Sequence, residues 1–232
     1  MRRAAAAGAI LLLAGCTAPA GEAARPGDTV TVFAAASLTG AFDEIAGDFE
    51  AANPGVDVVL NFGGSASLAN QIAEGAPADV FASAAGDAGE IFATNSLEIA
   101  VPLGNPAWVT GVEDFADPDL KIAICAIEVP CGAAAQRVFE TLGLTAAPDT
   151  LEQDVKAVLT KVELGEVDAG LVYRTDVLAA RGTVEGIEFA EAQRAVNRYP
   201  IAALTGRGEA FVVWVLSDAG QAVLREAGFG AP

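Results

Sequence analysis

The chain has 232 residues, of which 53% are hydrophobic and none is histidine, and its formal net charge at pH 7 is -18. So negative a surface argues against nucleic acid and anionic lipid as partners, because both would be repelled. The absence of histidine removes the most common general base and the most common metal ligand, which argues against most catalytic and metal-binding classes.

Residues 1–16 have the form of an export signal. A basic start is followed by an apolar run over residues 4–13 and by the sequence LAGC, a lipobox that ends at Cys16. Lipoprotein processing makes this cysteine the new N-terminus, so we predict a lipid anchor at Cys16 and a location on the cell membrane, facing the periplasm or the cell exterior. A plain signal peptide cleaved nearby is the alternative, and the apolar run is too short to span a membrane.

Residues 17–27 are small, polar and rich in proline and glycine, which predicts a flexible tether. The rest of the chain is long enough for one large domain or for two of about 100 residues each.

The first strand and helix predict an anion site. Residues 29–33 are β-branched and aromatic, which indicates a buried strand, and apolar residues then recur at spacings of four, three and four from Leu38 to Phe49, as on one face of a helix. Ser37 therefore lies near the start of a helix, where free N–H groups and the helix dipole favour an anion. The alternative is an ordinary serine N-cap.

The same arrangement occurs a second time. A strand is predicted over 56–62 and a helix over 68–74, and the turn between them, GGSAS, contains Ser65. Two such turns on neighbouring parallel strands would direct two helix N-termini into one crevice, where open α/β sheets bind ligands. A flexible Gly/Ser loop is the alternative reading of this turn.

The rest of the chain continues to alternate strands and helices, which predicts an α/β class with mainly parallel sheets. Further strands are expected over 80–83, 97–101, 121–127, 167–173, 187–190 and 198–204, with a poorly patterned segment over 84–95. Helices are expected over 133–142, 154–164, 176–180, 211–216 and 220–227, with a short helix or turn over 113–120. We predict two domains, one formed by 28–101 and 204–232 and the other by 102–203.

Two cysteines remain after lipidation of Cys16, namely Cys125 and Cys131. Because an even number of cysteines remains and the protein is exported, we predict one disulfide between them. A pair of reduced, buried thiols is the alternative. Cys131 precedes Gly132 near a predicted helix start, so a catalytic thiolate is conceivable, but it would lack the usual histidine base.

Eight segments in order along the mature chain form a recognisable series: TVFAAASL at 31–38, FGGSASLANQIAEGAPADVFASA at 62–84, NSLEIAVP at 95–102, VPCGAAA at 129–135, QDV at 153–155, GLVY at 170–173, RYPIAAL at 198–204 and GQAVLREAGF at 220–229. With this series the chain resembles the periplasmic molybdate-binding proteins of ABC transporters. The resemblance implies a two-domain type II periplasmic binding protein, with a hinge crossed twice and a cleft that closes on molybdate or tungstate.

The resemblance also implies the ligand residues. They are Ser37 and Ser65 from the first domain and Cys131, Val155 and Tyr173 from the second. In the family, the positions that match Cys131 and Val155 supply backbone N–H groups, whereas the serines and the tyrosine supply hydroxyl groups. A dianion can be held by such neutral donors alone, and discrimination from sulfate would then depend on the size of the cavity.

The implied partner is an ABC importer permease in the inner membrane, and we expect a monomer with no cofactor, no enzymatic activity and no metal other than that of the bound oxyanion. The alternatives are a receptor for another tetrahedral oxyanion such as sulfate or phosphate, a cysteine-dependent enzyme, and a structural lipoprotein with a vestigial site. The chain is shorter than the family pattern at 84–95 and at 205–210. Neither departure removes a ligand position, so we expect them to affect the stability of the first domain more than the specificity for the anion.

Overall fold

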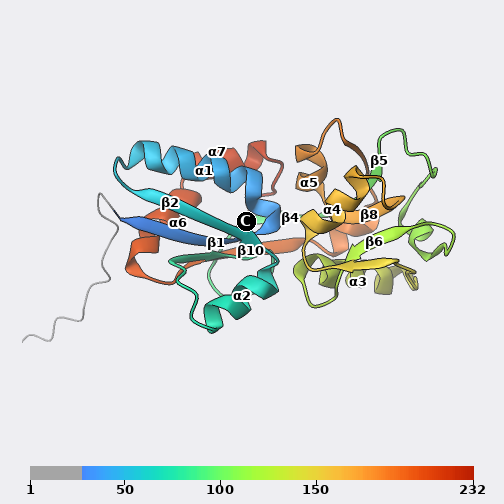
Figure 1. Cartoon of the computed structure of the whole chain (residues 1–232), viewed down its shortest axis with the longest axis horizontal. Coiled ribbons are helices and arrows are strands. Elements are labelled where there is room, and N and C mark those ends of the chain that lie inside the picture. The colour runs from blue at the N-terminus through green and yellow to red at the C-terminus, as the bar shows by residue number, and fades with distance from the viewer. Residues whose placement is uncertain (1–27) are drawn as a thin grey trace, which may run out of the picture.

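The computed structural model describes residues 28–232. The predicted export signal, the lipobox with Cys16 and the tether lie outside the described residues. Two lobes lie side by side, and each is built around its own five-stranded sheet (Figure 1). None of the helices in residues 28–232 has the length and apolar character needed to cross a membrane.

The first lobe comprises residues 28–95 and 197–232. Its strands lie in the order β2 (Asp57–Gly63), β1 (Thr29–Ala35), β3 (Val80–Ala82), β10 (Asn197–Ala203) and β4 (Glu90–Asn95). Its helices are η1 (Ala36–Leu38), α1 (Thr39–Ala52), α2 (Ser65–Ala73), η4 (Gly206–Gly208), α6 (Glu209–Leu216) and α7 (Asp218–Glu226).

Successive side chains of β1 point to opposite faces of the first sheet, which explains how both faces are covered. Val32 points into the main core with the aromatic rings of α1 and α6, whereas Phe33 points to the opposite face and packs against Leu68 of α2. Figure 1 accordingly shows α1 and α7 on one side of this sheet and α2 on the other.

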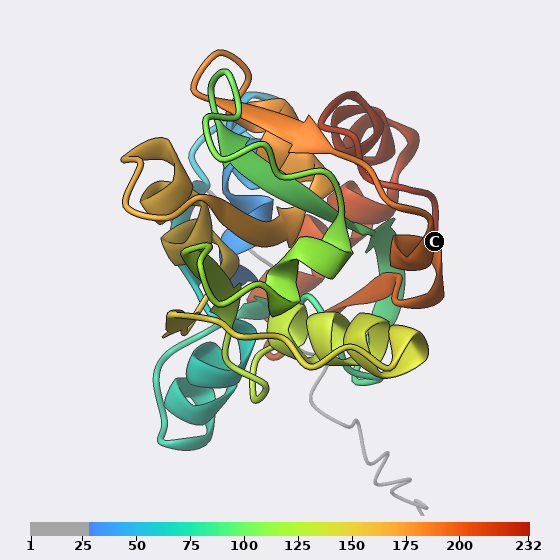
Figure 2. The ribbon, with the colours of Figure 1, turned by 90° about the vertical axis from the view of Figure 1, so that its right-hand side faces the viewer.

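The second lobe comprises residues 96–196. Its strands lie in the order β7 (Thr150–Glu152), β6 (Ile122–Cys125), β8 (Ala169–Tyr173), β5 (Leu97–Pro102) and β9 (Val184–Ile187). Its helices are η2 (Val112–Ala116), α3 (Pro130–Leu142), α4 (Val155–Glu163), α5 (Arg174–Ala179) and η3 (Ala190–Arg194). Every residue of β6 and β8 is buried, because helices cover the sheet, as the end-on view of this lobe shows (Figure 2).

The α/β fold class is confirmed, but the sheets are mixed and the prediction of mainly parallel sheets is wrong. Strand β1 is parallel to β2 and β3, and β6 is parallel to β7 and β8. Strands β10 and β5 run antiparallel to both of their neighbours. Both of these strands follow a passage between the lobes, so each enters its sheet from the hinge side and runs antiparallel to its neighbours in that sheet.

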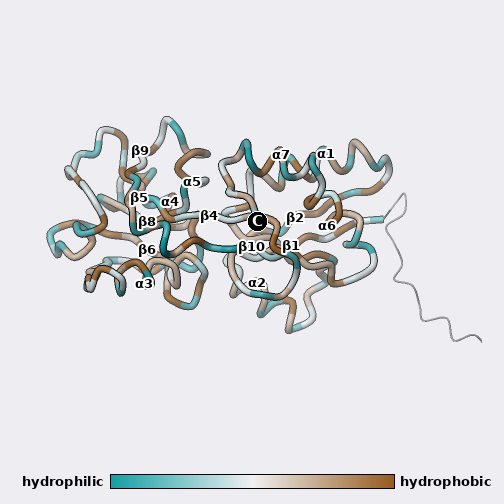
Figure 3. Tube along the Cα trace, turned by 180° about the vertical axis from the view of Figure 1, so that it is seen from behind, coloured by the Kyte–Doolittle hydropathy of each residue, from teal (hydrophilic) through white to brown (hydrophobic). Residues whose placement is uncertain are grey.

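The strand pairing also moves the predicted domain boundaries. Strand β5, predicted almost entirely in the first domain, pairs with β8 in the second sheet, and β10, predicted in the second domain, pairs with β3 and β4 in the first. The chain therefore passes between the lobes at Ser96 and again at Val196, beside β4 and β10 (Figure 3). Apolar patterning identifies a strand but does not say which sheet it joins, because pairing is set by contacts that are distant in sequence.

Two strands were not predicted. Strand β4 lies in the poorly patterned segment 84–95, where it pairs with β10 at the end of the first sheet and forms a single bridge to Gly230. Strand β7 is an edge of the second sheet, where it pairs in parallel with β6. Short edge strands carry little of the burial pattern that identifies central strands, which is why the sequence does not reveal them.

Candidate anion-binding site

Several turns that leave the two sheets meet between the lobes. They are the turns from β1 to η1, from β2 to α2, from β6 to α3 and from β7 to α4. A small cavity of about 20 Å³ lies where they meet. Its lining comprises Ala35, Ala36, Ser37, Gly63, Gly64, Ser65, Ala84, Val129, Pro130, Cys131, Asp154, Val155 and Tyr173. The structure thus places all five predicted ligand residues around one cavity.

The hydroxyl groups of Ser37, Ser65 and Tyr173 line this cavity, and each also contacts a polar group of the protein. Ser65 Oγ accepts a hydrogen bond of 3.0 Å from the backbone N–H of Ala84, and the Tyr173 hydroxyl accepts one of 2.7 Å from Asn197 Nδ2. Because a hydroxyl has a single hydrogen, accepting a bond from behind leaves that hydrogen for the cavity.

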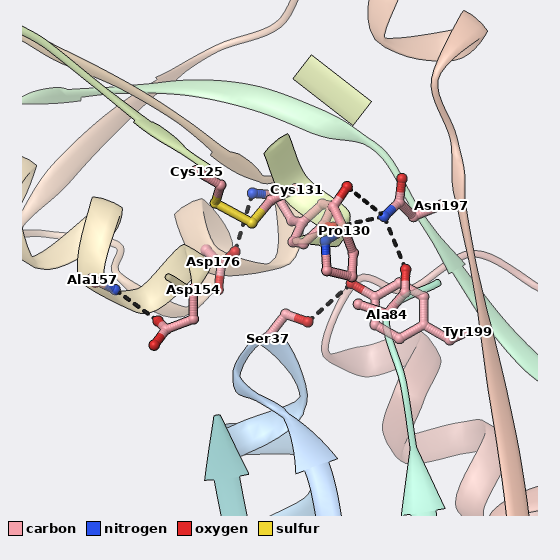
Figure 4. Close-up of a disulfide and its surroundings, with 11 residues drawn as sticks. Ser37, Ala84, Cys125, Pro130, Cys131, Asp154, Ala157, Asp176, Asn197 and Tyr199 are labelled. Atoms are coloured by element: carbon pink, nitrogen blue, oxygen red, sulfur yellow. Dashed lines mark hydrogen bonds between the residues drawn. A yellow bond between two sulfur atoms is a disulfide. The ribbon is translucent and has the colours of Figure 1, made fainter. Parts of the chain in front are cut away.

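The hydroxyl of Ser37 lies 2.9 Å from that of Tyr199, and either atom can be the donor (Figure 4). The amide of Asn95 lies on the other side of Tyr199, with its Nδ2 3.5 Å from the phenolic oxygen. When Tyr199 accepts from Asn95 it is free to donate to Ser37, and the hydrogen of Ser37 is then also left for the cavity.

Three helices begin at the cavity. Ser65 is the first residue of α2, Val155 is the first residue of α4, and Cys131 is the second residue of α3 after Pro130. N–H groups in the first turn have no partner within their own helix and lie at the positive end of its dipole. These helix starts therefore direct backbone donors and positive potential at one point, which favours an anion.

The alternative reading of Ser37 as an ordinary N-cap does not hold. Ser37 lies inside the short helix η1, and the residue before α1 is Leu38, whose side chain makes no capping bond. The side chain of Ser65 caps no helix either, because the residue before α2 is Gly64. Asp154, by contrast, is the N-cap of α4, since its carboxylate accepts from the N–H of Ala157 at 2.9 Å.

A disulfide joins Cys125, the last residue of β6, to Cys131 in the first turn of α3 (Figure 4). The turn that it closes is tight, because a Cβ atom on Gly132 would lie within 3.0 Å of the carbonyl oxygens of Ala126 and Cys125. The bond therefore fixes the loop that presents the Cys131 N–H to the cavity, and it leaves no thiol there for catalysis.

Replacing both Cys125 and Cys131 by serine is expected to lower the free energy of unfolding by about 2 kcal/mol, because the unfolded chain regains the entropy of a short closed loop. Urea unfolding monitored by circular dichroism measures the change. The wild-type protein unfolded with a reducing agent is the matched control and should show the same loss. An unchanged urea midpoint in both samples would show that the bond contributes nothing to stability.

The phenols near the cavity stay protonated. Burial raises the pKa of Tyr173 well above its ordinary value of 10.0, and the neighbouring Tyr199 and Asp176 raise it further. Burial also raises the pKa of Tyr199. Both hydroxyls are therefore neutral donors at every physiological pH. The charge of Lys156 is paired, because its Nζ lies 2.9 Å from Asp176 Oδ1.

The size and lining of the cavity restrict its ligand. Organic ligands of drug size occupy pockets of about 300–1,000 Å³, far larger than this space. Neither lysine nor arginine lines it.

A larger hollow of about 360 Å³ lies behind the hinge, where Glu98, Arg174 and Glu188 carry charges of both signs. Within residues 28–232, no cluster of three or more cysteine, aspartate or glutamate side chains could hold a metal ion.

Residues behind the cavity were not predicted as part of the site. Asn197 and Ala84 orient two of the hydroxyls, and Tyr199 contacts the third. Tyr199 lies in the motif RYPIAAL, but its role depends on contacts across the hinge that the motif alone does not specify.

Comparisons with known proteins identify the relatives of this chain. A family model described as bacterial extracellular solute-binding protein matches residues 30–230. The molybdate-binding protein ModA of Mycobacterium tuberculosis is 39% identical over 243 residues, which cover 96% of this chain and 93% of the relative.

Two solved structures share the fold. The periplasmic molybdate-binding protein of Azotobacter vinelandii gives a TM-score of 0.72 at 23% identity and covers 88% of this chain and 99% of its own. The sulfate-binding protein SubI of Mycobacterium tuberculosis gives the same TM-score at 16% identity, covering 87% of this chain and 86% of its own. At these identities the structures establish the fold alone, whereas the family match and the relative at 39% identity establish membership. The chain belongs to the bacterial extracellular solute-binding protein family, together with the ModA proteins.

Proposed function

We propose that the chain binds molybdate or tungstate between its two lobes and delivers the anion to an ABC importer. The observation that carries this proposal is the single small cavity in which three hydroxyl groups and the starts of three helices converge without a lysine or arginine. The high identity to a relative named as molybdate-binding supports the choice of anion.

In this proposal, Ser37, Ser65 and Tyr173 donate through their hydroxyl groups, and Cys131 and Val155 donate through backbone N–H groups. Because the donors are neutral, release of the anion requires no strong ion pair to break, which suits a protein that must hand over its ligand. Each lobe supplies part of the set, so only the closed arrangement satisfies the anion and binding favours closure.

The remaining assignments follow from the export signal and the family. The protein acts as an exported receptor, anchored to the membrane through lipid at Cys16, and it binds and releases its ligand without catalysing a reaction. No cofactor is needed, because the oxyanion itself is the cargo. The partner is an importer permease, and a monomer suffices, since one chain supplies both lobes of the site.

Thermal unfolding with different anions tests the proposal. Molybdate or tungstate at about 100 times the dissociation constant should stabilise the protein by about 2.7 kcal/mol, a rise in melting temperature of roughly 5–10 °C. Sulfate and phosphate at the same concentration should give no comparable rise, because their shorter bonds to oxygen leave the cavity underfilled. Stabilisation by sulfate or phosphate alone would replace the proposed ligand, and cooperative melting unaffected by every anion would refute the receptor function.

A further inference from the structure

Asn197 lies at the second passage between the lobes and makes an unusual number of contacts for a buried side chain. It is the first residue of β10 and is 3% exposed. Its Oδ1 accepts a hydrogen bond of 3.1 Å from Arg137 Nη2. Because an arginine side chain can only donate, this contact fixes which end of the amide is oxygen and which is nitrogen.

The other end of the amide therefore donates. Asn197 Nδ2 lies 2.7 Å from the Tyr173 hydroxyl, 2.9 Å from the carbonyl oxygen of Ala84 and 3.3 Å from that of Pro130 (Figure 4). The first of these contacts makes the tyrosine oxygen an acceptor on its outer side. Its own hydrogen then has no acceptor in the amide and can point into the cavity.

These contacts belong to different lobes. Asn197 and Ala84 are in the first lobe, whereas Arg137, Pro130 and Tyr173 are in the second. The set is complete only when the lobes are close together. Separation of the lobes would release the tyrosine and leave Asn197 bonded to Ala84 alone.

From this geometry we propose that Asn197 is a positioning residue that holds the Tyr173 hydroxyl as a donor to the bound oxyanion when the lobes close. Arg137 contributes by setting the orientation of the amide. This inference rests on the proposed function, because it assigns a role toward the ligand of the same cavity. It goes beyond that function, since the ligand set itself does not include Asn197.

Two substitutions separate positioning from a merely structural role. Asn197→Ala removes the donor, whereas Asn197→Asp keeps the shape and the partner of Arg137 but replaces the donor by a carboxylate oxygen. That oxygen would accept the hydrogen of Tyr173 and turn it away from the ligand. The aspartate variant should therefore bind less tightly than the alanine variant. Its stability is measured separately in urea, because its carboxylate pairs with Arg137 but also faces the carbonyl oxygens of Ala84 and Pro130.

The measurement is isothermal titration of molybdate into the purified wild-type protein and its variants. Asn197→Ala should weaken binding about tenfold, the usual effect of losing one such bond, and Asn197→Asp at least a hundredfold. In a Tyr173→Phe background, where no hydroxyl is left to position, Asn197→Ala should change the affinity by less than about threefold. Asn53→Ala is the matched control, because it removes an asparagine amide bonded to the Phe49 carbonyl at 2.8 Å, away from the cavity, and should leave affinity unchanged.

The outcomes separate this inference from the proposed function. Wild-type protein that binds no oxyanion would overturn both. Wild-type protein that binds molybdate while Asn197→Ala weakens binding equally with and without the Tyr173 hydroxyl would overturn the positioning role alone. The same conclusion would follow if the affinities of the alanine and aspartate variants simply tracked their stabilities in urea.

Discussion

Replacing Gly64 by alanine is expected to weaken molybdate binding by about 5- to 150-fold while leaving the stability of the anion-free protein almost unchanged. Gly64 precedes α2 in the first lobe, and a Cβ atom there would lie closer than 3.0 Å to the carbonyl oxygen of Gln153 in the second lobe. Because the obstacle is backbone, no side-chain rotation relieves the clash, and the lobes must stay apart. Overpacking of this kind costs about 1–3 kcal/mol, which corresponds to that loss of affinity.

Gly63→Ala provides the matched control for this variant. A Cβ atom on Gly63 would meet only the side chain of Leu68, at 3.4 Å, which is an ordinary van der Waals contact. Isothermal titration with molybdate and urea unfolding without it should therefore separate the two variants in affinity but not in stability. Equal affinities would show that close approach of Gly64 to Gln153 is not needed for binding.

Replacing Asp79 by alanine is expected to lower the free energy of unfolding by about 3 kcal/mol, because it removes the buried carboxylate that pairs with Arg207 and leaves the partly buried N–H of Thr31 without a partner. The Asp79 carboxylate accepts from Thr31 N at 2.9 Å, from Thr205 Oγ1 at 2.6 Å and from Arg207 Nη2 at 2.9 Å. These bonds tie β1 to η4 beneath the first sheet. This loss of about 3 kcal/mol lies at the lower end of the usual cost of breaking a buried ion pair. Half of the Arg207 side chain is exposed, so water can solvate its charge once Asp79 is gone.

Urea unfolding at neutral pH measures this loss, and Asp48→Ala is the control. Asp48 is exposed on α1, so its replacement should change the free energy of unfolding by less than about 0.5 kcal/mol. Equal effects of the two substitutions would show that the network around Asp79 does not stabilise the fold.

The contribution of Asp79 should also depend on pH. Burial alone would raise the pKa of Asp79, but hydrogen bonds from Thr205, Thr31 and Arg207 and the charge of Arg207 outweigh it and hold the pKa below its ordinary value of 3.8. A group with a lowered pKa in the folded state stabilises the protein above its unfolded pKa and loses that effect as the pH falls through the folded value. The gap in stability between wild type and Asp79→Ala should therefore stay constant near neutral pH and narrow below pH 3.8.

The amino-acid sequence by itself determined the local units and the chemistry of the site. The pattern from Thr29 to Phe49 predicted the strand β1 and the helix after it, and the helix predicted from residue 154 is α4, which Asp154 caps. These features are local, since periodicity, capping and turn residues act within a few positions of the chain. The pairing of Cys125 with Cys131 was likewise open to prediction, because export and an even number of cysteines leave few choices.

The tertiary structure alone decided which sheet each strand joins and how the donors are oriented. The direction of β5 and β10, and with it the position of both hinge passages, depends on pairs such as Leu97 with Tyr173 and Ile201 with Ala82. The donation from Asn197 to Tyr173 likewise joins residues 24 positions apart. Local patterns carry no information about such distant partners. The sequence therefore specified which donors the protein possesses, and only the packing of the two lobes decided where their hydrogens point.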